Sequence, residues 1–214
     1  MKVITFLLLL TPIFGYASLP EPELPLDIKS YWVAKHMELN DLPMNIRSFT
    51  TSIPLELLQR EMTIFLENIS NNKIQEAVDT EGWVSLSAAS REAFYVVKLK
   101  SNGLISEGLF TVSALGKKKV VEESFPNGVL RIQKQRFLDG PHTQEFEVFS
   151  TLSGRAEARV LIEQIMKKRG WYITRRHDLD VQLFVRNRDY ANVVMQDNES
   201  GVGTLILISK ELSK

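Results

Sequence analysis

The chain contains no cysteine and has no excess of charge of either sign. Of its 214 residues, 26 are Lys or Arg and 26 are Asp or Glu, so the formal net charge is zero. The lack of cysteine excludes disulfide scaffolds, thiolate zinc sites, cysteine nucleophiles and lipoproteins acylated on cysteine. A general nucleic-acid binder carries a basic excess, so the balanced charge argues against nucleic acid as a partner.

Long hydrophobic runs are absent as well, apart from one at the N-terminus. Val3 to Leu10 is apolar except for Thr5, and Lys2 supplies a positive charge before it. Gly15-Tyr16-Ala17 offers small residues at the minus-three and minus-one positions of a cleavage site, which predicts a secretory signal peptide over residues 1–17. A membrane anchor is the alternative, but the run is shorter than the roughly 20 residues that a span needs. No transmembrane segment is expected after cleavage.

Export without cysteine favours a bacterial periplasm, or otherwise secretion, because exported eukaryotic domains of this size often rely on disulfides. Cleavage after Ala17 removes one charged residue, Lys2, and leaves one more acidic than basic residue. With 44% hydrophobic residues, the mature chain is expected to fold as one globular domain or two small ones.

Residues 18–44 are predicted to form a Pro-rich N-terminal arm. Pro20, Pro22 and Pro25 favour an extended, polyproline-like segment. This arm could be a spacer, a strap that binds a partner, or a disordered leader. It contains two basic and five acidic residues.

A connector hairpin is predicted over residues 114–144, with Val129 to Phe137 as one of its strands. The connector contains six basic and three acidic residues, so it is the most basic stretch of the chain. We therefore expect the acidic arm to lie across the basic connector, near Lys117 and its neighbours.

The main pattern is an internal duplication of segments 45–113 and 145–214. Phe49 and Phe149 lie 100 positions apart on similar short strands, and an amphipathic helix is predicted after each strand. The apolar positions of the two helices match at the same offset: Leu58 with Ala158, Met62 with Ile162, Phe65 with Ile165, and Leu66 with Met166.

Both predicted helices have start signals and are followed by a Gly-Trp pair. Ser52 and Ser153 are the predicted N-caps. Gly82-Trp83 follows the first helix after an insertion, and Gly170-Trp171 follows the second directly. The matched positions predict that each tryptophan anchors its helix to a sheet.

Runs of alternating apolar and polar residues follow each helix and predict antiparallel strands. Asn102-Gly103 is a strong hairpin signal between two of these runs. Each lobe is therefore expected to be a β-α-β-β-β unit, with one helix packed on an antiparallel sheet. The fold class is predicted to be α+β, with two tandem, internally duplicated lobes.

The sequence contains no recognisable catalytic or metal-binding motif. It has neither a Gly-x-Ser-x-Gly elbow nor a His-x-x-x-His pair, and His36, His142 and His177 are far apart. The nearest approach to a metal cluster is His177 with Asp178 and Asp180, but this segment also fits a polar turn between strands. We assign no catalytic residue, metal ligand or cofactor.

Two basic clusters are the candidate binding residues. The first could contact an acidic surface or lipid headgroups, although the pattern favours a solvated loop. The second adjoins the polar turn. These residues are Lys117, Lys118 and Lys119, and Arg175, Arg176 and His177.

The expected function is that of an exported, non-catalytic periplasmic binding or assembly factor that acts through protein–protein contacts. An envelope protein is the expected partner, because small α+β lobes offer free sheet edges for strand addition. The alternative is a small-ligand or glycan-binding protein that uses the cleft between the lobes. An exported hydrolase is a third class, and it would need a histidine within hydrogen-bond reach of a serine and a carboxylate.

Overall fold

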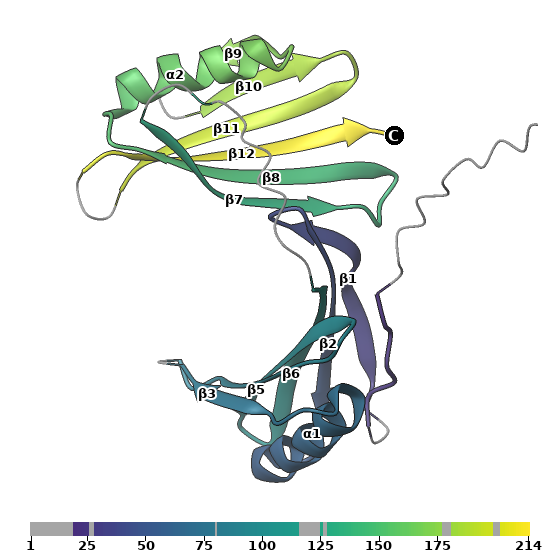
Figure 1. Ribbon diagram of the computed structural model, residues 1–214. Coiled ribbons are helices and arrows are strands. Elements are labelled where there is room, and N and C mark those ends of the chain that lie inside the picture. The colour runs from purple at the N-terminus through teal and green to yellow at the C-terminus, as the bar shows by residue number, and fades with distance from the viewer. Residues whose placement is uncertain are drawn as a thin grey trace, which may run out of the picture.

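The described part of the chain forms one continuous antiparallel sheet with two helices (Figure 1). The computed structural model describes residues 19–25, 28–79, 81–115, 125, 128–176, 181–198 and 202–214. The sheet has twelve strands in the order β3-β4-β5-β6-β2-β1-β7-β8-β12-β11-β10-β9. In these ranges, neither helix has the length and apolar character that crossing a membrane requires.

The strand order divides the sheet into two halves. The first half contains β1 (Ser30–Leu39), β2 (Leu42–Thr51), α1 (Leu55–Ser70), β3 (Gln75–Val78), β4 (Val84–Ala89), β5 (Ala93–Asn102) and β6 (Ile105–Ala114). The second contains β7 (Val129–Phe137), β8 (His142–Thr151), α2 (Arg155–Lys168), β9 (Tyr172–Arg176), β10 (Val181–Arg186), β11 (Asp189–Asp197) and β12 (Thr204–Ser213).

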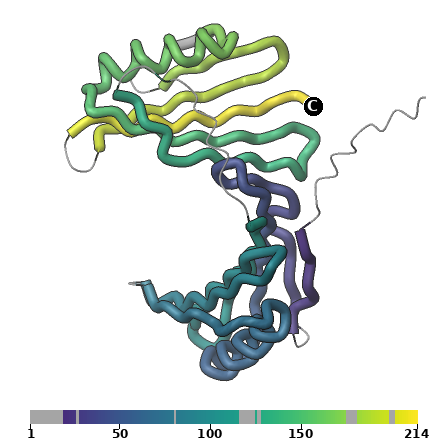
Figure 2. Tube along the Cα trace, in the orientation of Figure 1, coloured from purple at the N-terminus to yellow at the C-terminus, as the bar shows by residue number. Residues whose placement is uncertain are grey.

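The two halves meet where β1 pairs with β7. This ladder contains three residue pairs, from Met37 with Phe137 to Leu39 with Gln135. From this junction outwards, the first half reads β1-β2-β6-β5-β4-β3 and the second reads β7-β8-β12-β11-β10-β9. Figures 1 and 2 show α1 and α2 near opposite ends of the molecule, with the junction between them.

The predicted α+β class is confirmed, but the expected β-α-β-β-β order is incomplete. Each half has two strands before its helix and four after it. The strand predicted over Val129 to Phe137 is β7, whereas β1 lies within the predicted arm and β3 within the predicted insertion. β1 is irregular, and all four residues of β3 are exposed, so neither strand gives a clear alternating pattern. The lobe boundaries themselves stay predictions.

Each half packs a hydrophobic core between its helix and its sheet. Phe49 and Phe149 are fully buried in the two separate cores. The helix positions that match in the sequence are buried in both cores, as their periodicity predicts. They are Leu58, Met62, Phe65 and Leu66 of α1, and Ala158, Ile162, Ile165 and Met166 of α2.

The predicted helix caps are wrong. The N-cap residues are Pro54 and Gly154, and neither makes a side-chain capping hydrogen bond. The expected caps, Ser52 and Ser153, precede these positions. In each half, the threonine that ends the preceding strand accepts a hydrogen bond from the backbone N–H two residues later and so forms the turn into the helix.

The two Gly-Trp pairs are not structurally equivalent. Gly170 ends α2 with φ +78°, and Trp171 is buried in the second core, as predicted. Gly82 also has a positive φ, +81°, but its pair precedes β4, and Trp83 is only half-buried and outside the core. The reason is that β3 separates α1 from Gly82-Trp83, whereas its topological counterpart β9 follows Trp171.

Both helices lie on the same face of the sheet. Side chains of residues directly opposite in an antiparallel ladder point to the same side. Across the junction, Pro43 lies opposite Glu38, Glu38 opposite Arg136, and Arg136 opposite Glu145. Pro43 and Glu145 lie six and four residues before Phe49 and Phe149 on their strands, so each points to the same face as the core phenylalanine that its helix covers. One sheet face therefore continues from one core to the other.

Candidate functional site

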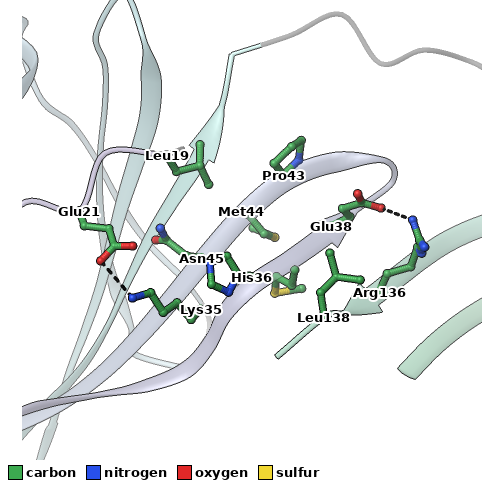
Figure 3. Close-up of a pocket in the computed structure, with 11 residues that line it drawn as sticks. Leu19, Glu21, Lys35, His36, Glu38, Pro43, Met44, Asn45, Arg136 and Leu138 are labelled. Atoms are coloured by element: carbon green, nitrogen blue, oxygen red, sulfur yellow. Dashed lines mark hydrogen bonds and ion pairs between the residues drawn. The ribbon is translucent and has the colours of Figure 1, made fainter. Parts of the chain in front are cut away.

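A pocket of about 480 Å³ lies at the junction of the two halves (Figure 3). Its walls come from the segment before β1, from the β1–β2 hairpin, and from β7 with the residue that follows it. Volumes of this size are typical of ligand sites. The apolar residues that line it are Leu19, Met37, Pro43, Met44 and Leu138.

The β1–β2 hairpin reaches the second half because of its tight turn. Asn40 and Asp41 have φ values of +51° and +64°, as a two-residue hairpin turn of the primed type requires. The backbone N–H of Asn40 donates to the Lys134 carbonyl at 2.8 Å, and the Lys134 N–H donates to Asn40 Oδ1 at 3.0 Å. The turn therefore fastens the hairpin to β7 and forms one side of the pocket.

Two ion pairs lie at opposite ends of the pocket (Figure 3). Lys35 Nζ is 3.6 Å from Glu21, and Arg136 Nη1 is 2.8 Å from Glu38. Arg136 Nε also lies 3.5 Å from Glu145. Each of the two cations on the pocket wall, Lys35 and Arg136, therefore has a carboxylate close to it that balances its charge.

Glu38 also bears on the expected contact between arm and connector. Glu38 and Asp41 belong to the predicted acidic arm, and they approach Arg136 at 2.8 Å and Lys134 at 3.9 Å, two residues of the predicted connector. These contacts agree with the expected attraction, although Lys117 lies outside the described residues.

The Asp139 carboxylate holds the β1 side of the junction. It accepts hydrogen bonds from the backbone N–H of Lys35 at 2.6 Å and of His36 at 2.9 Å, and it lies 2.8 Å from His36 Nδ1. Burial opposes ionisation of Asp139, but the hydrogen bonds from His36 and Lys35 outweigh it and hold the pKa below its usual value. This carboxylate therefore stays ionised and keeps β1 fastened to the end of β7.

Asn45 is the buried polar side chain of the pocket wall. It lies on β2, is 2% exposed, and has no hydrogen-bond partner for Oδ1 among the described residues. A buried polar group without a partner costs about 1–3 kcal/mol. Oδ1 is itself buried, so a ligand group would recover that cost only if the amide turned toward the pocket.

The corresponding position of the second half is fully paired. Asn45 and Glu145 each lie four residues before the buried phenylalanine of their strand. Opposite Asn45 on β6 is Val112, whereas opposite Glu145 on β12 is Lys210. Glu145 lies 2.6 Å from Lys210 Nζ and also contacts a second lysine, from β7. The polar group at this location is therefore paired with cations in the second half, whereas in the first half Asn45 Oδ1 has no partner among the described residues.

A buried ionic cluster surrounds Lys210 in the second half. Lys210 is 6% exposed, and its ammonium group contacts both Glu145 and Glu147. Arg169, just after α2, donates to Glu147 at 2.8 Å. Burial raises the pKa of Glu147, but Lys210 and Arg169 outweigh this effect and lower it to about 2. The cluster therefore places compensated charges at the end of the second core, where they line a cavity of about 240 Å³.

Arg47, two residues beyond Asn45, fastens the N-terminal segment to the first half. Its guanidinium lies 4.9 Å from the centre of the Trp32 ring and 5.4 Å from that of Phe110, and it donates to the Pro22 carbonyl at 2.5 Å. Burial lowers the pKa of Arg47, and Glu21 opposes this effect. Arg47 thus holds the segment that contributes Leu19 to the pocket.

The structure does not bring the predicted binding residues to this pocket. The backbone of Arg175 and Arg176 lies in β9, at the edge of the sheet, and four strands separate β9 from β7. His177, Lys117, Lys118 and Lys119 lie outside the described residues.

Two histidines can be placed. His36 lines the pocket and contacts Asp139, and His142 Nε2 lies 3.8 Å from Glu211. In the described ranges, neither ring has a serine hydroxyl among its hydrogen-bond partners. The hydrolase alternative therefore gains no support from these two residues.

The pocket was not expected from the sequence because two of its three walls lie almost entirely in residues 18–44, which were assigned to a Pro-rich arm. The Asn40-Asp41 dipeptide was the available signal, since these residue types favour turns with positive φ. Recognising this turn would have predicted β1 and β2 as a hairpin.

Comparisons with known proteins found no match, so only the geometry of the site bears on its function. No family model matches the chain, and neither a curated protein nor a solved structure is significantly similar to it.

Proposed function

We propose that this protein is a non-catalytic binding protein that holds a small ligand in the pocket between its two halves. The observation that carries the proposal is Asn45, a buried amide on the pocket wall whose Oδ1 lacks a partner among the described residues. Apolar walls with a few polar groups that fix orientation are typical of small-molecule sites.

The contrast with the second half supports a binding role for Asn45. There, Glu145 is satisfied by Lys210 and Lys134. The same scaffold can therefore satisfy a polar group at this location. An unpaired group that persists at a cost in stability is typical of a functional site.

We further propose that the halves arose by internal duplication and that the protein works after export. The repeated strand order supports the duplication. So does a repeated contact: Ser106 Oγ donates to the Ile53 carbonyl at 2.7 Å, and Thr204 Oγ1 donates to the Ser153 carbonyl at 2.9 Å. The support for export, to the periplasm or beyond, is the N-terminal sequence pattern.

Binding of an envelope protein by strand addition is the second candidate function. Its support is β3, an edge strand whose four residues are all exposed, with Val78 at 65%. An exposed edge strand offers backbone groups to an incoming strand. The two candidates use different surfaces, so substitutions in the pocket separate them.

The test is a thermal-shift screen of the mature chain, residues 18–214, against small molecules. Leu138→Trp places a large side chain in the pocket, and Leu104→Trp is the matched control, because Leu104 is 96% exposed and outside the pocket. Ligands that raise the Tm of the wild type should raise that of Leu104→Trp equally and that of Leu138→Trp much less. Equal stabilisation of all three proteins would contradict the proposed site.

A further inference from the structure

We propose that two copies of this chain associate through the sheet face of the second half that lies opposite α2. The inference goes beyond the proposed function and is independent of it, because the residues that carry it do not line the junction pocket. It follows from three properties of this face: no described helix covers it, its centre is apolar, and its size matches that of a stable interface.

The face opposite α2, called the open face below, is uncovered in the described ranges. All buried residues of β8 and β12 belong to one alternating set, which includes Phe149 and Ile206 of the second core. The residues between them are partly or fully exposed, and β10 and β11 show the same alternation. Figure 1 shows α2 on one side of these strands, and α1 packs on β4 and β5 of the first half instead. This alternation is that of a sheet covered on one side only.

The centre of the open face is a row of aliphatic side chains across four neighbouring strands. Val148 lies opposite Leu207, and Leu207 lies opposite Val194. Val194 in turn lies opposite Val181. Leu207 and Val194 are 42% and 41% exposed, so they still have apolar surface to lose to a partner.

The charged residues of these strands lie mainly on the covered face. Glu145, Glu147 and Lys210 belong to the buried set and neutralise one another there. A sheet face that meets water normally carries the polar residues, whereas the covered face carries the apolar ones. Glu211 is on the open face, but it lies four positions beyond Leu207, near the end of β12. The centre of the open face can therefore be buried without leaving a charge unpaired.

A second copy of the same face is the occupant that these properties favour. In a two-fold dimer both subunits use the same patch, so a charge at its centre would face its own copy, and the aliphatic row avoids this. The six strands β7–β12 are five to ten residues long. With strands about 4.8 Å apart and a rise of about 3.3 Å per residue, they present a face of roughly 800 Å². Stable interfaces bury about 800 Å² on each partner, so two open faces packed as a β-sandwich would be large enough.

The corresponding face of the first half is less suited to such a contact. There, Leu109 of β6 lies between Ser48 of β2 and Lys98 of β5. A lysine in this position would be buried against its own copy, at a cost that the aliphatic row of the second half does not incur. The contact is therefore assigned to the second half.

Sedimentation equilibrium of the mature chain, residues 18–214, measures the association at micromolar concentrations. The wild type should have the mass of two chains. Leu207→Glu places a carboxylate at the centre of both faces and should raise the dissociation constant of the dimer at least about 100-fold, because each buried charge would lack a partner. Leu57→Glu is the matched control and should leave the constant unchanged, because Leu57 is 49% exposed and lies on α1.

Cross-linking locates the contact with neutral substitutions, which keeps the test valid if Leu207→Glu does not fold. The chain has no cysteine, so Leu207→Cys and Leu57→Cys each carry a single thiol. A short bismaleimide should join two chains of Leu207→Cys and leave Leu57→Cys unlinked. A wild type that stays monomeric would overturn the inference and leave the open face to a different occupant. A dimer that persists in folded Leu207→Glu, or a cross-linking yield for Leu207→Cys no higher than for Leu57→Cys, would overturn it as well.

Discussion

Asn45 and Glu145 occupy corresponding positions in the two halves, and among the described residues the Glu145 carboxylate has partners whereas Asn45 Oδ1 has none. Lys210 lies opposite Glu145 and contacts it at 2.6 Å, whereas Val112 lies opposite Asn45 and offers no polar group. The two residues occupy matching places on the β2–β6 and β8–β12 ladders, but β1 is irregular opposite Asn45, whereas Arg136 of β7 pairs in register with Glu145. The difference also appears in the cavities: the junction pocket has a volume of about 480 Å³, whereas the ionic cluster of the second half lines a smaller cavity of about 240 Å³.

Removing Lys210 should destabilise the protein strongly. Lys210→Met keeps a long side chain but leaves Glu145 and Glu147 buried without their shared cation. Breaking a buried ion pair on one side costs about 3–5 kcal/mol, so we expect a loss of this order in the free energy of unfolding from urea denaturation. Lys73→Met, at an exposed position, should change it by less than about 0.5 kcal/mol. A similar stability for both variants would show that the cluster is not structural.

The same cluster predicts a pH dependence of stability. The pKa of Glu147 is lowered from 4.5 to about 2 in the folded protein, so its contribution to stability is present above pH 4.5 and is lost as the pH falls towards 2. Glu147→Gln should make the stability less dependent on pH in this range. The control is Glu211→Gln, at a half-exposed carboxylate. Urea denaturation at a series of pH values checks this, and a wild-type slope retained in Glu147→Gln would contradict the assignment.

Gly108 should not tolerate a side chain. Gly108 lies opposite Phe49 in the β2–β6 ladder, and a Cβ atom built on it would overlap the Phe49 ring, which is fully buried. Overpacking of this kind costs about 1–3 kcal/mol, and Gly108→Ala should lower the free energy of unfolding by at least this amount. At Gly154 a Cβ meets nothing within 4 Å, so Gly154→Ala is the matched control. Equal Tm values for the two variants would mean that Phe49 can move.

The sequence predicted the two cores better than the outer strands. The buried positions of α1 and α2 repeat every three or four residues because each helix covers one sheet, and this period is visible in the residues alone. The β7 strand was predicted for a similar reason. β3 was missed because it is short and wholly exposed, and it therefore shows no apolar pattern. It is defined by its backbone pairing with β4.

The pocket could not be predicted because its residues come from distant parts of the chain. Arg136 contacts Glu38 from 98 positions away, and Asp139 fastens β1 from 103 positions beyond His36. Charge composition indicated an attraction between the acidic arm and the basic connector. The contact of Arg136 with Glu38 has this polarity, whereas Asp139 is an acidic residue of the connector that binds His36 of the arm. The register of β1 with β7 decides which side chains meet, and the sequence carries no local signal for that register.

The most direct test of the account is the stability of Asn45→Leu in the absence of any ligand. If Asn45 is retained for binding, removing its unpaired amide should leave the free energy of unfolding unchanged or raise it by about 1 kcal/mol, measured by urea denaturation beside the wild type. A loss of about 2 kcal/mol or more would show that Asn45 holds the fold together, and it would contradict the proposal that this residue is kept for a ligand.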